Sequence, residues 1–408
     1  MQTKKNIFNW VFYDFANSLV MIVFFLYFAQ WAVVDRGISD LTFNLTFTMS
    51  AILLLLTAPV TGNLLDKSWR RITGLRITTI FTAIFYGACA LLAINNKDTW
   101  ALIFFTLGLY SYLLSFTFYT PLINDIAKRE SRGFISGLGI AANYLGQIVG
   151  LIIALPFANG KISFFNGVAR AETLLPSVIL FFLLSLPMLL FFNEPRKLLV
   201  KTKFIQAIKE TFASTKNLIV GSSVGFFLLS YFLFNDAIMT AVNNFPIFLQ
   251  QVWNISDTTK TYLLLAVMVT SGIGAILSGI YADKNGHKKT MIGILFVWMI
   301  IFPFMGLIRS WSLFVVACIF LGLFFGANWA VSRSIMSYVA PKEKSNLAFA
   351  YFGLAERASS FVGPIMWGLI ATGLLNWGVV RYRIAMVSLS IFIILGILAM
   401  IKVKSDRK

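Results

Sequence analysis

Residues 62–71 read GNLLDKSWRR, and residues 279–289 read GIYADKNGHKK. Each stretch has a glycine, then an Asp-Lys pair, then a pair of basic residues, and each falls between two long apolar blocks. The same polar loop at corresponding places indicates that the chain is built from two related halves.

Longer segments repeat in the same way. AKRESRGFISGLGIAANYLGQIVG at 127–150 corresponds to APKEKSNLAFAYFGLAERASSFVG at 340–363, at a constant spacing of 213 residues. Near the start of each half, FYDFANS at 12–18 corresponds to FNDAIMT at 234–240, which places Asp14 opposite Asp236. The repeat therefore includes loops and apolar blocks of both halves.

The composition places the chain in a membrane. Of its 408 residues, 58% are hydrophobic and 12% are charged, and many apolar blocks have the length that crosses a bilayer core of about 30 Å. The N-terminus, MQTKKNIFNW, has no cleavable signal pattern, so we expect the first span to remain. We predict an all-α membrane protein with twelve spans, roughly at 8–34, 42–65, 72–94, 99–124, 133–157, 173–192, 219–250, 258–282, 289–308, 311–339, 346–374 and 380–401.

The distribution of Lys and Arg predicts the orientation. Of the 34 basic residues, 24 lie at the termini and in the loops on their side, and eight lie on the opposite side. Cytoplasmic loops carry the excess of Lys and Arg, so we expect both termini in the cytoplasm and the chain in the cell inner membrane. The same pattern accounts for the net charge of +18 without a nucleic acid partner.

The longest polar interruption divides the chain. Pro195 ends the sixth span, and the apolar residues from Phe204 to Phe212 have the spacing of an amphipathic helix on the inner membrane face. We predict an N-terminal six-helix bundle over 1–192, a cytoplasmic linker over 193–217 and a C-terminal six-helix bundle over 218–408.

Two six-span halves with this loop motif resemble the major facilitator superfamily. A narrower resemblance, to its vacuole-effluxer branch, rests on YDFANS, YFLFNDAIMT at 231–240, RGFISGLGIAANYLG at 132–146, and SRSIMSYVAP with FGLAERASSFVGP at 332–364. It implies two pseudo-symmetric bundles that expose a central site alternately. Yeast members of this branch are regarded as amino-acid exporters, from which this chain departs by shorter loops and by Glu356.

The resemblance also implies an inner gate, in which the loop aspartate lies near a helix end and pairs with loop arginine or lysine. In the first half, SWRR lacks the glycine that usually follows the Asp-Lys pair. The alternative is that these loops are basic only because inner loops generally are. The gate candidates are Asp66 with Arg70 and Arg71, and Asp283 with Lys288 and Lys289.

Carboxylates inside the spans are candidate binding groups, because a charged side chain at a helix centre costs at least about 2.5 kcal/mol and usually faces a cavity or a partner. Asp14 has Asn17 on its helix face, and Asp236 has Asn235 beside it and Asn243 two turns on. These oxygens suit a proton, a cation or a substrate ammonium group. The alternative is a polar clamp between helix ends.

Charged residues of the tenth and eleventh spans form a second candidate group. Arg333 or Arg357 would suit a substrate carboxylate, because a guanidinium binds carboxylates bidentately. Glu356 is adjacent to Arg357 and points elsewhere, so it could instead meet Arg333. In the first half, Asn143 and Tyr144 hold the equivalent places. The alternative is an ion pair that holds the two spans together.

The remaining residues argue against an enzyme. Cys89 and Cys318 lie far apart, and the single histidine, His287, lies in a basic loop, where a solvated side chain is expected. The sequence has no G-x-x-x-x-G-K-[ST] or H-E-x-x-H pattern. We therefore predict neither metal nor cofactor, and an ion or substrate gradient as the energy source.

The leading hypothesis is a monomeric secondary transporter that moves a small polar solute through the lipid bilayer. An amino acid is the favoured substrate and a proton the favoured coupling ion. The same groups would also serve a sugar, a siderophore or a peptide-like metabolite. A transporter-shaped sensor without flux stays open as well, since a fold does not determine a function.

Overall fold

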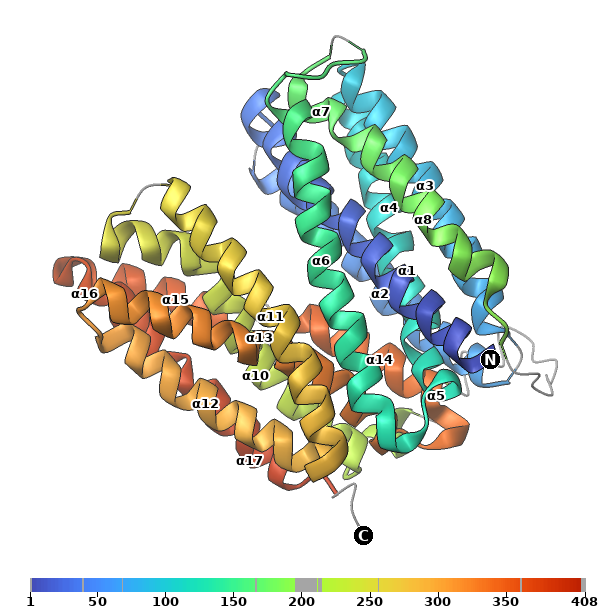
Figure 1. Cartoon of the computed structure of the whole chain (residues 1–408). Coiled ribbons are helices and arrows are strands. Elements are labelled where there is room, and N and C mark those ends of the chain that lie inside the picture. The colour runs from blue at the N-terminus through green and yellow to red at the C-terminus, as the bar shows by residue number, and fades with distance from the viewer. Residues whose placement is uncertain are drawn as a thin grey trace. The chain divides into compact units, whose positions relative to one another are not determined.

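The computed structural model describes residues 2–38, 40–67, 69–165, 167–194, 211, 215–255, 257–359 and 362–404. Every regular element in these ranges is a helix, which confirms the all-α membrane fold (Figure 1). The predicted amphipathic helix over Phe204–Phe212 and most of the predicted linker lie outside the described residues, apart from Thr211.

The first compact unit comprises Met1–Ala127, Ala142–Thr211 and Glu343–Ala350. Within it, α3 packs along α4 and α8, and α1 packs along α8 (Figure 1). Its helices are α1 (Gln2–Val23), α2 (Asp40–Lys67), α3 (Arg71–Ile94), α4 (Asp98–Tyr119), α5 (Ile123–Ile126), most of α6 (Arg132–Ala158), α7 (Ala169–Glu172), α8 (Leu174–Phe191) and the start of α14 (Ser345–Ala358).

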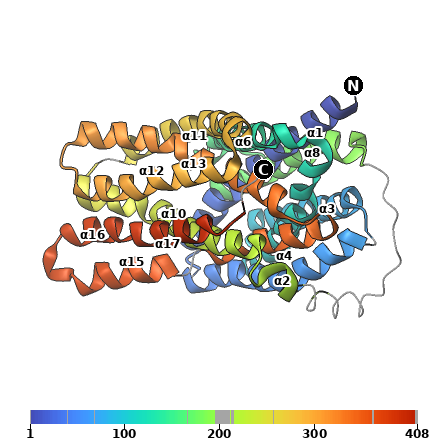
Figure 2. The same cartoon turned by 90° about the horizontal axis from the view of Figure 1, so that it is seen from below.

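The second compact unit comprises Lys128–Ala141, Phe212–Lys342 and Tyr351–Lys408. Within it, α11, α12 and α13 lie side by side (Figure 2). Its helices are the start of α6, α10 (Ser223–Phe248), α11 (Asp257–Asn285), α12 (His287–Leu307), α13 (Trp311–Val339), the end of α14, α15 (Val362–Gly373), α16 (Val380–Ser388) and α17 (Ser390–Ile401). Helices α6 and α14 thus contribute to both units.

The span predicted over 346–374 differs from the others. Eleven helical segments of the described chain are long and apolar enough to cross a membrane. At 346–374 the structure has instead α14, of 14 residues, and α15, of 12 residues, with residues 360 and 361 outside the described part. Pro364 explains a helix start here, because proline suits the first turn of a helix and clashes with a carbonyl in the interior.

Glycines let the helices of the second unit approach closely. A Cβ atom built on Gly326 of α13 would overlap the Ser271 carbonyl oxygen of α11. A Cβ atom on Gly137 of α6 would overlap the Ala275 carbonyl oxygen, also on α11. Small residues let membrane helices pack closely in this way.

Replacing Gly326 with alanine is expected to destabilise the second unit, because the added methyl group has no room. Overpacking of this kind costs about 1–3 kcal/mol, so the melting temperature of the purified protein should fall. Gly293→Ala on α12 is the matched control, since nothing lies within 4 Å of its Cβ position. Equal melting temperatures for Gly326→Ala and the wild type would contradict the close α11–α13 contact.

Candidate functional site

Asp14 lies on α1 in a buried polar layer of the first unit. Asp14 and Asn17 have 0% exposure, so the Asp14 carboxylate faces neither lipid nor solvent. The Tyr13 hydroxyl lies 2.6 Å from the Thr79 hydroxyl of α3. Asn17 and Ser115 of α4 are further polar neighbours of the Tyr13 phenol. The layer provides the polar surroundings that a carboxylate needs within a membrane span.

Asp236 and Asn235 lie on α10 in the second unit and reach the ends of two other helices. The Gly363 backbone N–H, in the first turn of α15, donates to Asp236 Oδ2 at 2.6 Å. Asn235 Nδ2 donates to the Ser359 hydroxyl at 2.5 Å, and that hydroxyl donates to the Glu356 carbonyl at 2.7 Å. We call Ser359 and Gly363, which flank residues 360 and 361, the α14–α15 junction.

Three charged residues lie within electrostatic range of the Tyr231 phenol of α10. Arg333, Glu356 and Arg357 all act on it electrostatically. Arg333 is buried, with 8% exposure, whereas the Glu356 and Arg357 side chains are more than a third exposed. The Glu356 carboxylate lies 3.9 Å from the Arg357 guanidinium.

The structure therefore differs from the predicted pairing of Glu356 with Arg333. Among the described residues, the ion pair of Glu356 is with its sequence neighbour Arg357. Adjacent helical side chains diverge at Cβ, but these two are long and partly exposed, so their charged ends can still approach. At 3.9 Å between partly exposed groups, the pair contributes little stability.

Three other predicted residues have different surroundings. Asn143 of α6 accepts a hydrogen bond from Gln147 Nε2 at 2.7 Å, and Tyr144 is buried beside it in the chain. Asn243 is exposed, although it lies two turns from the buried Asp236 on the same helix. The structure therefore does not bring Asn243 into the buried layer of Asp236.

Asp66, at the end of α2, binds the start of α14 within the first unit. Its carboxylate accepts hydrogen bonds from Asn346 N at 3.0 Å, Asn346 Nδ2 at 2.6 Å and Leu347 N at 3.1 Å. Arg71 Nε donates to Asn346 Oδ1 at 2.6 Å, and Arg71 also pairs with Asp125. Asp66 thus satisfies backbone N–H groups that a helix start leaves free, where a negative charge is favoured.

Asp283, at the end of α11, binds the start of α6 within the second unit. Gly133 N and Phe134 N each donate to its carboxylate at 2.8 Å. His287 Nε2 lies 3.2 Å from Asp283 Oδ1, and the His287 ring lies 4.4 Å from that of Tyr338, between centroids. The expectation that His287 is solvated is wrong, because a carboxylate and an aromatic ring enclose it.

The predicted lysine partners of Asp283 lie elsewhere. Lys288 Nζ donates to the Ile401 carbonyl at 2.7 Å and the Val403 carbonyl at 2.6 Å, at the end of α17. The prediction that Asp283 pairs with Lys288 is therefore wrong. Lys288 binds the end of α17 because free carbonyls at a helix end attract a cation. Lys289 and Arg70 are exposed.

The helix starts that bind the two loop aspartates were missed by the sequence reasoning. Gly133 and Phe134 precede Asn346 and Leu347 by 213 residues, the spacing of the repeat. The repeat thus contained the signal, but the donors are backbone N–H groups. Every residue except proline has one, so no residue type reveals them.

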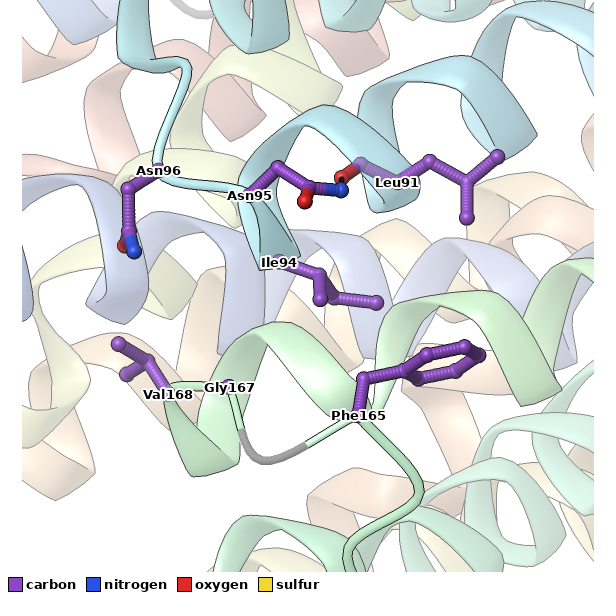
Figure 3. A pocket seen from close by; sticks show the side chains of 7 residues that line it. All are labelled: Leu91, Ile94, Asn95, Asn96, Phe165, Gly167 and Val168. Atoms are coloured by element: carbon purple, nitrogen blue, oxygen red, sulfur yellow. Dashed lines mark hydrogen bonds between the residues drawn. The ribbon is translucent and has the colours of Figure 1, made fainter.

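A separate pocket of about 490 Å³ lies in the first unit, near the end of α3 (Figure 3). Figure 3 shows Ile94 of α3 close to Phe165 and Val168 of the segment before α7. Its lining combines apolar side chains with two amides and is formed by Leu91, Ile94, Asn95, Asn96, Phe165, Gly167 and Val168. These residues include none of the predicted binding residues.

Comparisons with known proteins agree with this architecture. The family described as "Vacuole effluxer Atg22 like" matches residues 123–408, more than half of the chain. A "Multi-drug resistance efflux pump PmrA homolog" of Lactococcus lactis is 25% identical over 411 residues, which cover 97% of this chain and 94% of that relative.

Solved transporter structures share the fold at low sequence identity. The human organic anion transporter MFSD10 has a TM-score of 0.77 and 13% identity, covering 98% of this chain and 100% of its own. The E. coli fucose:proton symporter FucP has a TM-score of 0.73 and 12% identity, covering 98% and 99%. The chain therefore belongs to the vacuole effluxer Atg22-like family and is a multi-pass membrane transporter of the major facilitator superfamily, not an enzyme.

Proposed function

We propose that the chain is a secondary active transporter that carries an amino acid across the inner membrane by alternating access, driven by a proton gradient. One observation carries the proposal. Asp14 and Asp236, at corresponding places of the repeat, are both fully buried within membrane spans. Ionisable groups in such positions are costly and mark binding sites or ion pathways.

The charges of both signs favour a zwitterion as the substrate. The buried Arg333 guanidinium suits a carboxylate, which it can bind through two parallel hydrogen bonds. Asp14 or Asp236 suits an ammonium group or carries the coupling proton. An amino acid has a group for each of these signs, so we favour it over a sugar or a siderophore.

The coupling and the setting follow from the same physical arguments. A carboxylate can take up and release a proton, and one transporter that shares this fold is a fucose:proton symporter. The distribution of Lys and Arg supports cytoplasmic termini. We propose that the chain works as a monomer.

Reconstitution into proteoliposomes tests this function. A screen of amino acids, sugars, nucleosides and siderophores first identifies a ligand that raises the melting temperature of the purified protein. Uptake of that radiolabelled ligand is then measured with and without a pH gradient. Gradient-dependent accumulation of an amino acid supports the proposal. Binding without flux under any gradient would contradict it and favour a sensor.

Arg333→Ala is expected to weaken amino-acid binding more than it lowers thermal stability. Loss of hydrogen bonds between charged groups costs about 1.5–3 kcal/mol, which weakens binding by about tenfold or more. Isothermal titration and melting curves give the two quantities. Arg309→Ala is the control, since Arg309 is exposed after α12. A large loss of stability with unchanged binding would instead assign Arg333 to a structural role.

A further inference from the structure

The α14–α15 junction contains buried oxygen atoms that other contacts leave unsatisfied. Asn235 and Thr240 of α10 both have 0% exposure. Asn235 Oδ1 and Thr240 Oγ1 have no hydrogen-bond partner among the residues that the structure describes. A buried unsatisfied polar atom costs about 1–3 kcal/mol of folding free energy. Two such oxygens on the helix that carries Asp236 therefore require an explanation.

The contacts of three α10 side chains show that they point at this junction. Asn235 Nδ2 is hydrogen-bonded to the Ser359 hydroxyl at 2.5 Å, so the same amide carries Oδ1 to the end of α14. Asp236 Oδ2 accepts the Gly363 N–H at 2.6 Å. A Cβ atom built on Gly363 would overlap Thr240 Oγ1, so that hydroxyl lies against the first turn of α15.

The two first-half residues that correspond to Asn235 and Thr240 both have hydrogen-bond partners. The repeat pairs Tyr13 with Asn235 and Ser18 with Thr240. The Tyr13 hydroxyl has a partner, Thr79, at 2.6 Å, and Ser18 Oγ donates to the Phe15 carbonyl at 3.0 Å. At these two places of the repeat, the unsatisfied oxygens therefore occur in the second half alone, although the Asn17 amide of the first half also has no hydrogen-bond partner among the described residues.

The size of the junction restricts its occupant. Asn235, Asp236, Thr240 and Ser359 are all fully buried, and there is no room for a methyl group on Gly363. This close packing favours a small occupant such as an ion over an amino acid. The oxygens belong to a carboxylate, an amide and a hydroxyl, which are the ligands of hard cations.

We propose that the α14–α15 junction is a sodium site whose ligands are the Asp236 carboxylate, Asn235 Oδ1 and Thr240 Oγ1. One carboxylate balances a single positive charge. No group of three or more His, Cys, Asp or Glu side chains, as a transition metal prefers, occurs within the described ranges.

A metal ion explains these oxygens better than a proton does. A proton on Asp236 would bond to one acceptor, whereas a cation interacts with the carboxylate, the amide oxygen and the hydroxyl oxygen together. The inference rests on the proposed transport function and adds a second coupling ion to it. It assigns Asp236 to Na⁺ and leaves Asp14 as the proton carrier.

The test uses the purified full chain at constant pH and ionic strength, with NaCl, KCl or N-methylglucamine chloride. The melting temperature should rise saturably with Na⁺ and not with K⁺. Binding of ²²Na⁺ gives the affinity directly. Thr240→Val and Asn235→Ala should each weaken Na⁺ affinity at least tenfold. Thr240→Ser, which keeps the hydroxyl, should bind Na⁺ with the affinity of the wild type. Ser18→Ala, at the corresponding place in the first half, should bind Na⁺ as the wild type does.

Two results would overturn the sodium site. One is equal stabilisation of the wild type by NaCl and KCl, with a response to pH alone. The other is unchanged ²²Na⁺ affinity in both Thr240→Val and Asn235→Ala. Amino-acid uptake driven by pH without any Na⁺ effect would sink this inference and leave the proposed function intact. Na⁺ binding without amino-acid flux would support the sodium site and contradict the proposed transport function.

Discussion

Asp236→Asn is expected to reduce gradient-driven uptake to the background of empty liposomes while the protein still folds. Asparagine keeps an oxygen that accepts the Gly363 N–H, so the contact between α10 and α15 survives. It has neither the negative charge that holds a cation nor a group that titrates. Uptake of labelled substrate under an imposed ion gradient is the measurement, with melting temperature as the check of folding.

Two comparisons make this result specific. Asp236→Ala removes the oxygen as well, which leaves the Gly363 N–H unsatisfied at a cost of about 1–3 kcal/mol and should lower the melting temperature. Exchange of labelled for unlabelled substrate without a gradient should persist in Asp236→Asn, because coupling rather than binding is lost. Normal accumulation by Asp236→Asn would refute the coupling role of this carboxylate.

Asp66→Lys is expected to release the start of α14 and to open the inner gate. The substitution removes three accepted hydrogen bonds and places a positive charge at a helix N-terminus, where positive charge is disfavoured. Charge-assisted hydrogen bonds contribute about 1.5–3 kcal/mol each, comparable to the difference that separates two conformations. The loss is therefore large enough to shift the population of states.

Cysteine accessibility measures this release. Ala348 of α14 is fully buried, and the native Cys89 and Cys318 are buried too. A cysteine at position 348 should react with a membrane-impermeant maleimide at least tenfold faster in Asp66→Lys than in the parent. Lys342→Glu, a charge reversal at an exposed residue before α14, is the control. Unchanged labelling in Asp66→Lys would count against a gating role.

The fold could be predicted because its signals are local. A run of apolar residues is a span wherever it occurs, since lipid requires every backbone polar group to be satisfied within the helix. The two loops at 62–71 and 279–289 then revealed the repeat, and the repeat revealed the superfamily. Even the helix start at Val362 had a local signal in Pro364, although the sequence reasoning did not use it.

The partners of the predicted residues were harder to predict. His287 was expected in solvent, Lys288 beside Asp283, and Glu356 beside Arg333, and each has another neighbour. Those expectations used charge and sequence distance. The structure shows that charged side chains also bind helix ends. Lys288, for example, donates to carbonyls at the end of α17 and not to Asp283.

By itself, the sequence determined that the chain spans a membrane, that it has two related halves, and which acids lie inside its spans. These properties depend on the chemical type of each side chain, which the sequence states directly. The tertiary structure alone decided what the acids bind. Asp66, Asp283 and Asp236 each accept backbone N–H groups of a helix start distant in the chain. Because a backbone donor has no residue type of its own, only the packing of the helices selects it.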